Sequence, residues 1–311
     1  MTSDDLPPLP ATLLDPAQTA ARLPYLLLVK ELVRLLGDST VQVPARLVQP
    51  LPGGGSLFVM PALDARTAIT KLITFTPANA GSGLATIQGD VIVFDVASGQ
   101  RQLMLDGPTV TARRTAAVSL LAAQRLAPCK QGPLLIVGAG VQGKAHLEAF
   151  TEGLDIKEVA ITSLSDASAQ QLAAHARSLG LRARVVTDAN AALADCPLVV
   201  TCTPAHGVVL GALPRSDAFI AAVGAFTPTM AELSPALCQH VARHGTVVVD
   251  TTDARHEAGD LLQAGLDVTR FASLADVLRG PAFPVTGPVL FKSCGWAGWD
   301  LAAARTALAH A

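Results

Sequence analysis

The chain of 311 residues contains few aromatic and few charged side chains. Aromatic residues make up 4% and charged residues 15%, and there are one tyrosine and two tryptophans. Lysine and arginine together number 23 against 25 aspartates and glutamates, which gives a formal net charge of −2. Proteins that bind a nucleic acid backbone usually carry a large basic excess, so this balance argues against nucleic acid as a partner.

Paired cysteine motifs and long apolar runs are also missing. The five cysteines are scattered and form no CxxC pair, which is typical of reduced thiols in the cytoplasm. The chain is 50% hydrophobic, but its longest apolar stretches, such as 218–226, reach only about half of the ~18 residues that a membrane span needs. The first ten residues, MTSDDLPPLP, lack the basic and apolar regions of a secretory signal. We therefore expect a cytoplasmic protein without a membrane span.

A metal site is not expected. His240 and His244 are spaced to share one helix face, but no third ligand stands near them in the sequence.

Residues 1–115 mix one helical segment with several strand-like segments. Apolar residues recur at helical spacing over Leu23–Leu36, just before Gly37. The following segments are rich in Val, Ile, Thr and Phe and are separated by Gly or Pro, and Asp95–Gln100 is expected to form a hairpin turn. The pattern predicts an antiparallel meander.

Residues 116–280 alternate short apolar runs with Ala-rich helical runs. This βαβα order is typical of a doubly wound parallel sheet whose strands are buried on both faces. The last residues, 281–311, are expected to form a polar loop and a final helix, with Asp300 as the helix N-cap. The sequence thus predicts an α/β fold, with a Rossmann domain (116–280) inserted into an α+β domain (1–115 plus 281–311).

A glycine-rich loop follows the first strand of the predicted Rossmann domain. Gly138, Gly140 and Gly143 have GxGxxG spacing between the strand 134–137 and a helix. The glycines permit a tight turn, close approach of a pyrophosphate, and close helix–strand contact. We predict that this loop, including Val141 and Gln142, binds a dinucleotide.

The end of the second strand bears on the choice between NAD and NADP. A carboxylate about 20 residues after the loop would hold the ribose 2′-hydroxyl and repel a 2′-phosphate. This sequence has Ser163 and Ser165 there, and Asp166 is a candidate cap of the next helix. We expect NADP(H) to be favoured, with NAD(H) possible.

Three cations outside the Rossmann domain are candidate ligand residues. They are Arg46, Lys71 inside the apolar segment AITKLITF, and Arg114 near the start of a helix. A lysine in such a strand either snorkels at an edge or points into a cleft. Each cation taken alone fits a surface or salt-bridge role as well as a ligand role.

Several sequence blocks, in order, resemble the ornithine cyclodeaminase/mu-crystallin family over residues 20–308. They are TKLITF, DGPTVTARRTAAVSLLAA, VGAGVQG, VGAFTPTMAEL, VVVDTTDARHEAGDL and FKSCGWAGWDLAAA. The resemblance implies a Rossmann domain inserted into a substrate-binding and dimerisation domain, and a homodimer formed through the sheets of that domain. Its known activities include ornithine cyclodeamination, reduction of cyclic ketimines and alanine dehydrogenation.

The resemblance also implies roles for individual residues. It places Arg46, Lys71 and Arg114 on the substrate carboxylate. It assigns to the cofactor Thr115, Thr203, Val223, Gly224, Lys292 and Ser293.

Two departures from the cyclodeaminase pattern bear on the substrate. The block 224–228 has no aspartate. Cyclodeaminases also carry a glutamate two residues before the Met-Pro pair of the first domain, whereas Phe58 and Val59 precede Met60 here. Burying the second amine of ornithine without a carboxylate would be costly, whereas Phe58 and Phe226 suit an apolar ring. We therefore expect NAD(P)H-dependent reduction of a cyclic imino acid to L-proline or L-pipecolate. The alternatives are an ornithine cyclodeaminase, an alanine dehydrogenase and a non-catalytic mu-crystallin-like binding protein.

Overall fold

A computed structural model describes residues 12–79, 82–204, 207–280 and 282–310, which fall into two compact units. The first unit comprises Met1–Arg114 and Trp296–Ala311, and the second comprises Thr115–Gly295. The N-terminal segment that argued against a secretory leader, residues 1–10, lies outside the described residues. The chain enters the second unit within one helix, α3 (Gly107–Leu126).

The first unit is built on a six-stranded sheet in the order β1-β6-β5-β4-β3-β2. Strands β2 to β6 pair antiparallel with their neighbours along the chain, which confirms the predicted meander, and β1 runs parallel to β6. The turn expected at 95–100 joins β5 to β6. The strands are β1 (Thr12–Leu13), β2 (Leu47–Leu51), β3 (Gly55–Leu63), β4 (Thr67–Phe75), β5 (Ile87–Asp95) and β6 (Arg101–Asp106).

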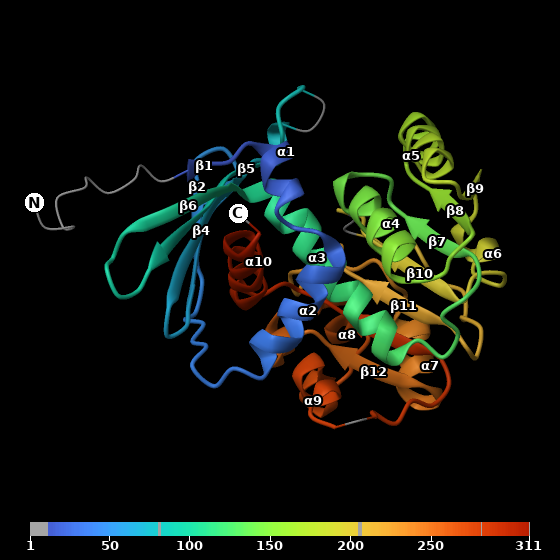
Figure 1. Ribbon diagram of the computed structural model, residues 1–311. Helices are drawn as coiled ribbons and strands as arrows, with labels where there is room; N and C mark the ends of the chain where they lie inside the picture. Colours follow the sequence, from blue (N-terminus) through green and yellow to red (C-terminus); the bar gives the residue numbers. More distant parts are fainter. Residues whose placement is uncertain (1–11, 80–81, 205–206, 281, 311) are drawn as a thin grey trace, which may run out of the picture. The chain divides into compact units, whose positions relative to one another are not determined.

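Helices cover one face of this sheet. Helix α10 (Ala297–Ala309) packs against β3, β4 and α2 (Tyr25–Leu36), as Figure 1 shows. Helix α10 is rich in alanine, and its alanines at 297, 302, 303, 304 and 307 are buried; such small side chains allow a helix to lie close to a sheet. Helix α2 confirms the segment predicted at 23–36, and Gly37 is its C-cap. The unit also contains the short helices α1 (Pro16–Ala21) and η1 (Pro77–Asn79).

One arginine ties α10 to the rest of the first unit. Arg305 pairs with Asp38 at 2.7 Å, with Glu31 at 3.4 Å and with Asp64 at 2.5 Å. Its side chain is mostly buried, so the three carboxylates hold the helix that also carries Asp300.

The second unit contains an eight-stranded parallel sheet in the order β13-β12-β14-β11-β10-β7-β8-β9. The strand order reverses between β7 and β10, which is the switch point where such folds bind dinucleotides. Every residue of β7, β10 and β11 is buried. The strands are β7 (Leu134–Val137), β8 (Glu158–Thr162), β9 (Arg182–Val185), β10 (Leu198–Thr201), β11 (Phe219–Ala222), β12 (Thr246–Val249), β13 (Ala272–Ser273) and β14 (Val289–Lys292).

Helices pack against this sheet and against one another. Helix α5 lies against β8 and β9, α4 against β7 and β10, and α7 against β12 (Figure 1). The helices are α4 (Val141–Gly153), α5 (Asp166–Ser178), α6 (Ala189–Ala192), α7 (Pro235–His244), α8 (Gly259–Gln263), α9 (Leu274–Leu278), η2 (Thr252–His256) and η3 (Val268–Arg270).

Three sequence predictions are wrong. Residues 281–295 belong to the second unit, because β14 pairs with β11 and β12 inside its sheet, so the boundary lies after Gly295 and not after 280. Asp300 is not a cap, since α10 begins at Ala297 and Asp300 is a buried residue of its first turn. Ser165, and not Asp166, caps α5.

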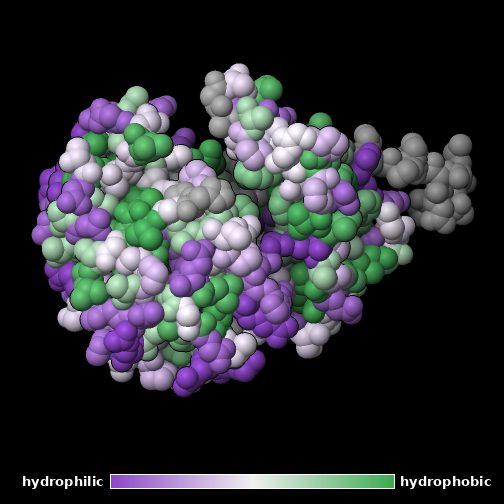
Figure 2. Space-filling model, turned by 180° about the vertical axis from the view of Figure 1, so that it is seen from behind, coloured by the Kyte–Doolittle hydropathy of each residue, from purple (hydrophilic) through white to green (hydrophobic). Residues whose placement is uncertain are grey.

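No helix in the described part of the chain is long and apolar enough to cross a membrane. Within 12–79, 82–204, 207–280 and 282–310 there is also no cluster of three or more His, Cys, Asp or Glu side chains that could hold a metal ion. Figure 2 shows one face of the molecule, where hydrophobic side chains form small groups among polar ones.

Candidate active site

A buried ion cluster lies between β4 and α10 in the first unit. Lys71 projects from the middle of β4 toward α10, where its Nζ lies 2.8 Å from Oδ2 of Asp300. Arg114, near the middle of α3, donates from Nε to Oδ1 of the same carboxylate at 3.2 Å. Lys71 is 1% exposed, Arg114 5% and Asp300 0%. One carboxylate therefore fixes two of the three predicted substrate cations.

The cluster carries an excess of positive charge. Burial, followed by the charges of Arg114 and Arg46, lowers the pKa of Lys71 to about 8, although the Asp300 carboxylate acts to raise it. The effect of Arg46 shows that the third predicted cation acts on the same lysine. The buried Lys71 and Arg114 against the single carboxylate of Asp300 leave a formal charge of +1. A buried excess of this kind favours binding of an anion such as a carboxylate.

Phe58 shares a sheet face with this cluster. Met60 lies opposite Lys71 in the register of β3 and β4, and Phe58 is two residues before Met60. Because side chains alternate along a strand, Phe58 and Lys71 project from the same face. The other predicted aromatic residue, Phe226, lies in the second unit after β11 and is half-buried.

The glycine loop of the second unit has the geometry of a phosphate cradle. Gly138 has a φ of 112°, and a Cβ there would lie 2.8 Å from the Cys202 carbonyl oxygen. A Cβ on Gly143 would collide with the Gly138 carbonyl oxygen. Gly140, by contrast, faces open space as the N-cap of α4, with nothing within 4 Å of an added Cβ. The loop thus packs tightly at two glycines and leaves room for a ligand at the third, which fits a dinucleotide pyrophosphate.

Two further predicted cofactor residues, Val141 and Gln142, form the first turn of α4 beside this space. Thr115 follows Arg114 on α3 and is buried at 9% exposure.

The end of β8 carries hydroxyl groups. Ser163 is half-buried, and the Ser165 hydroxyl accepts a hydrogen bond from the Ser168 backbone N–H at 3.3 Å. Leu164 between them is fully exposed. The first carboxylate after β8 is Asp166, inside α5.

Glu232, a buried residue that the sequence analysis did not single out, organises the loops after β10 and β11. Its Oε1 accepts hydrogen bonds from the backbone N–H of Thr203 at 2.6 Å and the Thr203 hydroxyl at 2.9 Å. Its Oε2 accepts from the backbone N–H of Gly224 at 2.7 Å and the Thr201 hydroxyl at 3.0 Å. Thr203 and Gly224, both predicted cofactor residues, are therefore joined by one carboxylate.

A second buried carboxylate holds the backbone of Glu232. Asp260 accepts hydrogen bonds from the backbone N–H groups of Glu232 at 2.6 Å and Leu233 at 2.8 Å, and pairs with Lys292 at 2.8 Å. Lys292 also donates to the Ala222 carbonyl oxygen at 3.3 Å and is fully buried. Although burial lowers the pKa of Lys292, Asp260 and other nearby acidic groups raise it above its ordinary value.

Asp250 plays a comparable part at the neighbouring strand end. It directly follows β12, and its Oδ2 accepts the Ser293 hydroxyl at 2.8 Å and the backbone N–H groups of Cys294 at 3.0 Å and Gly295 at 2.8 Å. Ser293, predicted for the cofactor, is thus held in place by a residue that sequence reasoning missed. The position of Asp250 at the carboxyl end of a parallel strand is the signal that could have found it.

Comparison with known proteins agrees with this geometry. The chain matches the ornithine cyclodeaminase/mu-crystallin family over residues 28–310. It is 41% identical over 296 residues to Delta(1)-pyrroline-2-carboxylate reductase 1 of Burkholderia multivorans, covering 94% of each chain. It is 39% identical over 301 residues to a Delta(1)-pyrroline-2-carboxylate/Delta(1)-piperideine-2-carboxylate reductase of Azospirillum brasilense, covering 96% of this chain and 95% of the relative.

Solved structures show the same fold at low identity. Delta(1)-pyrroline-2-carboxylate reductase of Thermococcus litoralis, solved with NADH and L-proline, has a TM-score of 0.87 at 23% identity over 96% of each chain. An archaeal alanine dehydrogenase dimer with bound NAD has a TM-score of 0.86 at 23% identity, covering 96% of this chain and 95% of that one. The chain belongs to the ornithine cyclodeaminase/mu-crystallin family.

Proposed function

We propose that this chain is an NAD(P)H-dependent reductase of cyclic imino acids, which converts Δ1-pyrroline-2-carboxylate to L-proline and Δ1-piperideine-2-carboxylate to L-pipecolate. The observation that carries the proposal is the buried Lys71–Asp300–Arg114 cluster with its excess positive charge. The identity of 41% to a Delta(1)-pyrroline-2-carboxylate reductase over 94% of the chain supports the same substrate class.

The cations hold the substrate carboxylate in this proposal. Arg114 uses Nε on Asp300, so we assign its two Nη groups to the carboxylate, where a guanidinium forms directional paired bonds. Arg46 adds positive charge that acts on Lys71. The apolar ring then lies against Phe58, on the sheet face that carries Lys71.

Lys71 supplies the proton that the reaction needs. With a pKa of about 8, the Lys71 amine is protonated at neutral pH. This pKa is also close enough to neutral pH for the amine to donate its proton during the reaction. It donates to the imine nitrogen, which makes the C=N carbon a better electrophile, and Asp300 keeps Nζ in position. A reduced nicotinamide cofactor, held by its pyrophosphate at the glycine loop, would supply the hydride.

The strand end at β8 favours NADP(H). Ser163 and Ser165 carry hydroxyls there, and the first carboxylate, Asp166, lies inside α5. Hydroxyl groups can donate to a 2′-phosphate, whereas a carboxylate would repel it. NAD(H) remains the second cofactor of the proposal.

The ornithine cyclodeaminase alternative lacks support in the structure. The segment 224–228 contains no carboxylate, and Phe58 lies on the Lys71 face. A second substrate amine would add to the existing positive charge of the cluster without an anion assigned to it.

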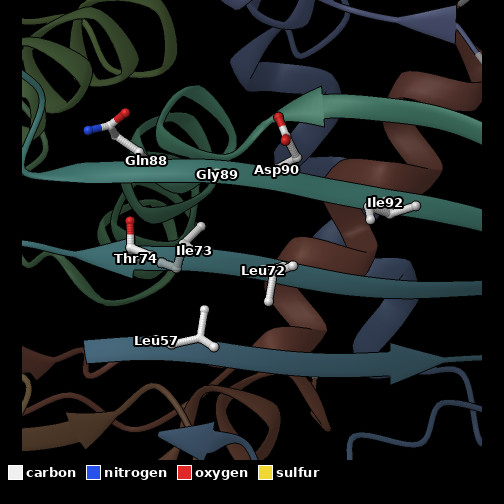
Figure 3. A pocket seen from close by; sticks show the side chains of 8 residues that line it. All are labelled: Leu57, Leu72, Ile73, Thr74, Gln88, Gly89, Asp90 and Ile92. Carbon is white, nitrogen blue, oxygen red and sulfur yellow. The ribbon is translucent and has the colours of Figure 1, made fainter. Parts of the chain in front are cut away.

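We also propose a homodimer, formed through the sheet face that points away from α10. Leu72 alternates with Lys71 and is 41% exposed. Figure 3 shows Leu57, Leu72 and Ile92 projecting from neighbouring strands around a depression of about 290 Å³. Leu57 and Ile92 are half-buried, and apolar side chains gathered on an accessible sheet face are typical of protein interfaces. A cytoplasmic location is supported by the five unpaired cysteines.

The test is oxidation of NADPH and NADH at 340 nm with each cyclic imine, beside wells with pyruvate plus ammonia, and wells with L-ornithine and NAD. Rapid oxidation with the cyclic imines alone supports the proposal. Release of ammonia and proline from ornithine, without imine reduction, contradicts it.

A further inference from the structure

The glycine loop and the Glu232 network lie on opposite sides of the strand-order reversal. The glycine loop follows β7, and the residue that would meet the adenosine ribose follows β8. Strands β10 and β11 lie on the other side of β7. A dinucleotide that crosses the switch point therefore places its second nucleotide, the one with the nicotinamide, at the ends of β10 and β11.

The loops at these two strand ends are in direct contact. A Cβ on Gly224 would collide with the Thr203 carbonyl oxygen, and one on Gly138 would lie 3.1 Å from Cγ2 of Thr203. Gly224 thus needs to be a glycine because the loop after β10 is so near. The Cβ added to Gly224 would also lie 2.5 Å from Oε1 of Glu232, so this carboxylate packs directly against the two loops.

We infer that Glu232 is a positioning residue for the nicotinamide half of the cofactor, an inference that rests on the proposed cofactor. It comes from the segment between β11 and α7, and each of its oxygens accepts one backbone N–H and one hydroxyl. Removal of this carboxylate leaves the Thr203 and Gly224 N–H groups without their acceptor. The two loops then lose the spacing that receives the nicotinamide ring.

Lys292 and Asp260 belong to the same buried hydrogen-bond network as Glu232. Asp260 holds the backbone of Glu232, and Lys292 neutralises Asp260 while it donates to Ala222 at the end of β11. Lys292, which the resemblance assigned to the cofactor, thus acts through Asp260 and the strand end and is buried away from solvent.

Glu232→Gln is a sharp test because an amide cannot replace this carboxylate. A hydroxyl can reverse its hydrogen bond, but a backbone N–H only donates. Either orientation of the glutamine therefore sets its NH₂ group against the N–H of Thr203 or of Gly224. The side-chain volume is unchanged, so the effect reports the hydrogen bonds.

Binding by isothermal titration calorimetry of NADPH and of 2′-phospho-ADP-ribose, which lacks the nicotinamide, separates the two cofactor halves. We expect Glu232→Gln to weaken NADPH by roughly tenfold, or about 1.4 kcal/mol, and to leave 2′-phospho-ADP-ribose nearly unchanged. Gly140→Val, which fills the pyrophosphate space, should weaken both ligands. NADH and ADP-ribose, which lack the 2′-phosphate, are titrated in the same way as a second pair of ligands.

Equal weakening of both ligands by Glu232→Gln, or of neither, would overturn the inference. If the unaltered protein binds none of the four ligands, the proposed function itself fails. Thr201→Val covers the case in which Glu232→Gln does not fold. It removes one hydroxyl donor at nearly constant volume, and it should weaken NADPH more than 2′-phospho-ADP-ribose. Equal effects there would also contradict the inference.

Discussion

Replacing Asp300 with asparagine removes the charge that Lys71 and Arg114 share while keeping the side-chain shape. Asp300 raises the pKa of Lys71 against the effect of burial, and the result is a pKa of about 8. Two unit charges about 4 Å apart interact by about 4 kcal/mol at an effective dielectric constant near 20. Since one pKa unit corresponds to about 1.4 kcal/mol, the substitution should move the pKa of Lys71 from about 8 to well below 7.

The pH dependence of kcat/KM for the cyclic imine measures this change. Protonated Lys71 is the active form in the proposal, so kcat/KM of the unaltered protein should fall as pH rises through about 8. In Asp300→Asn the same fall should occur about two to three pH units lower, which lowers kcat/KM at pH 7 by at least roughly tenfold. Both proteins see the same substrate titration, so the difference between the profiles reports the enzyme group.

Binding of NADPH is the control for Asp300→Asn, because the glycine loop and the Glu232 network lie in the second unit. That affinity should stay nearly constant. A profile with an unmoved midpoint would refute the assignment of Asp300 as the residue that sets the charge of Lys71.

Three further substitutions test other parts of the account. Arg114→Lys keeps the charge but loses the planar fork, so the KM for the imine should rise by roughly tenfold in steady-state assays; an unchanged KM would argue against carboxylate binding. Arg305→Met removes the cation that Asp38, Glu31 and Asp64 share beside α10 and should destabilise the fold by about 2–4 kcal/mol in urea unfolding, whereas a loss below about 0.5 kcal/mol would mean that these ion pairs are of the weak surface type. Leu72→Asp should shift the protein from dimer to monomer in sedimentation equilibrium, and a persistent dimer would place the interface elsewhere.

Much of the fold follows from local patterns in the sequence. The helical spacing at 23–36 predicted α2, and the Gly-bounded β-branched runs predicted the meander. The glycine loop was placed because Gly138, Gly140 and Gly143 stand between a strand and a helix. In the structure Gly138 and Gly143 have no room for a Cβ, whereas Gly140 faces open space.

Two of the wrong predictions, the domain boundary at 280 and the cap at Asp300, share a physical cause, which is dependence on distant residues. Strand β14 has four residues, and only its pairing with β11 and β12 makes it a strand. Asp300 looked like a cap because it precedes a run of helix formers. Its partner Arg114 is 186 positions away in the chain, so local spacing contains no sign of the cluster. Glu232 was missed for the same reason, since its four donors come from two other strand ends.

Transfer of deuterium from a labelled cofactor tests the central claim most directly. The protein would be incubated with Δ1-pyrroline-2-carboxylate and NADPH carrying deuterium at both C4 positions of the nicotinamide, and the product analysed by mass spectrometry and chiral chromatography. The expected product is L-proline with a single deuterium, at C2. Unlabelled proline, or no proline from the imine, would contradict it.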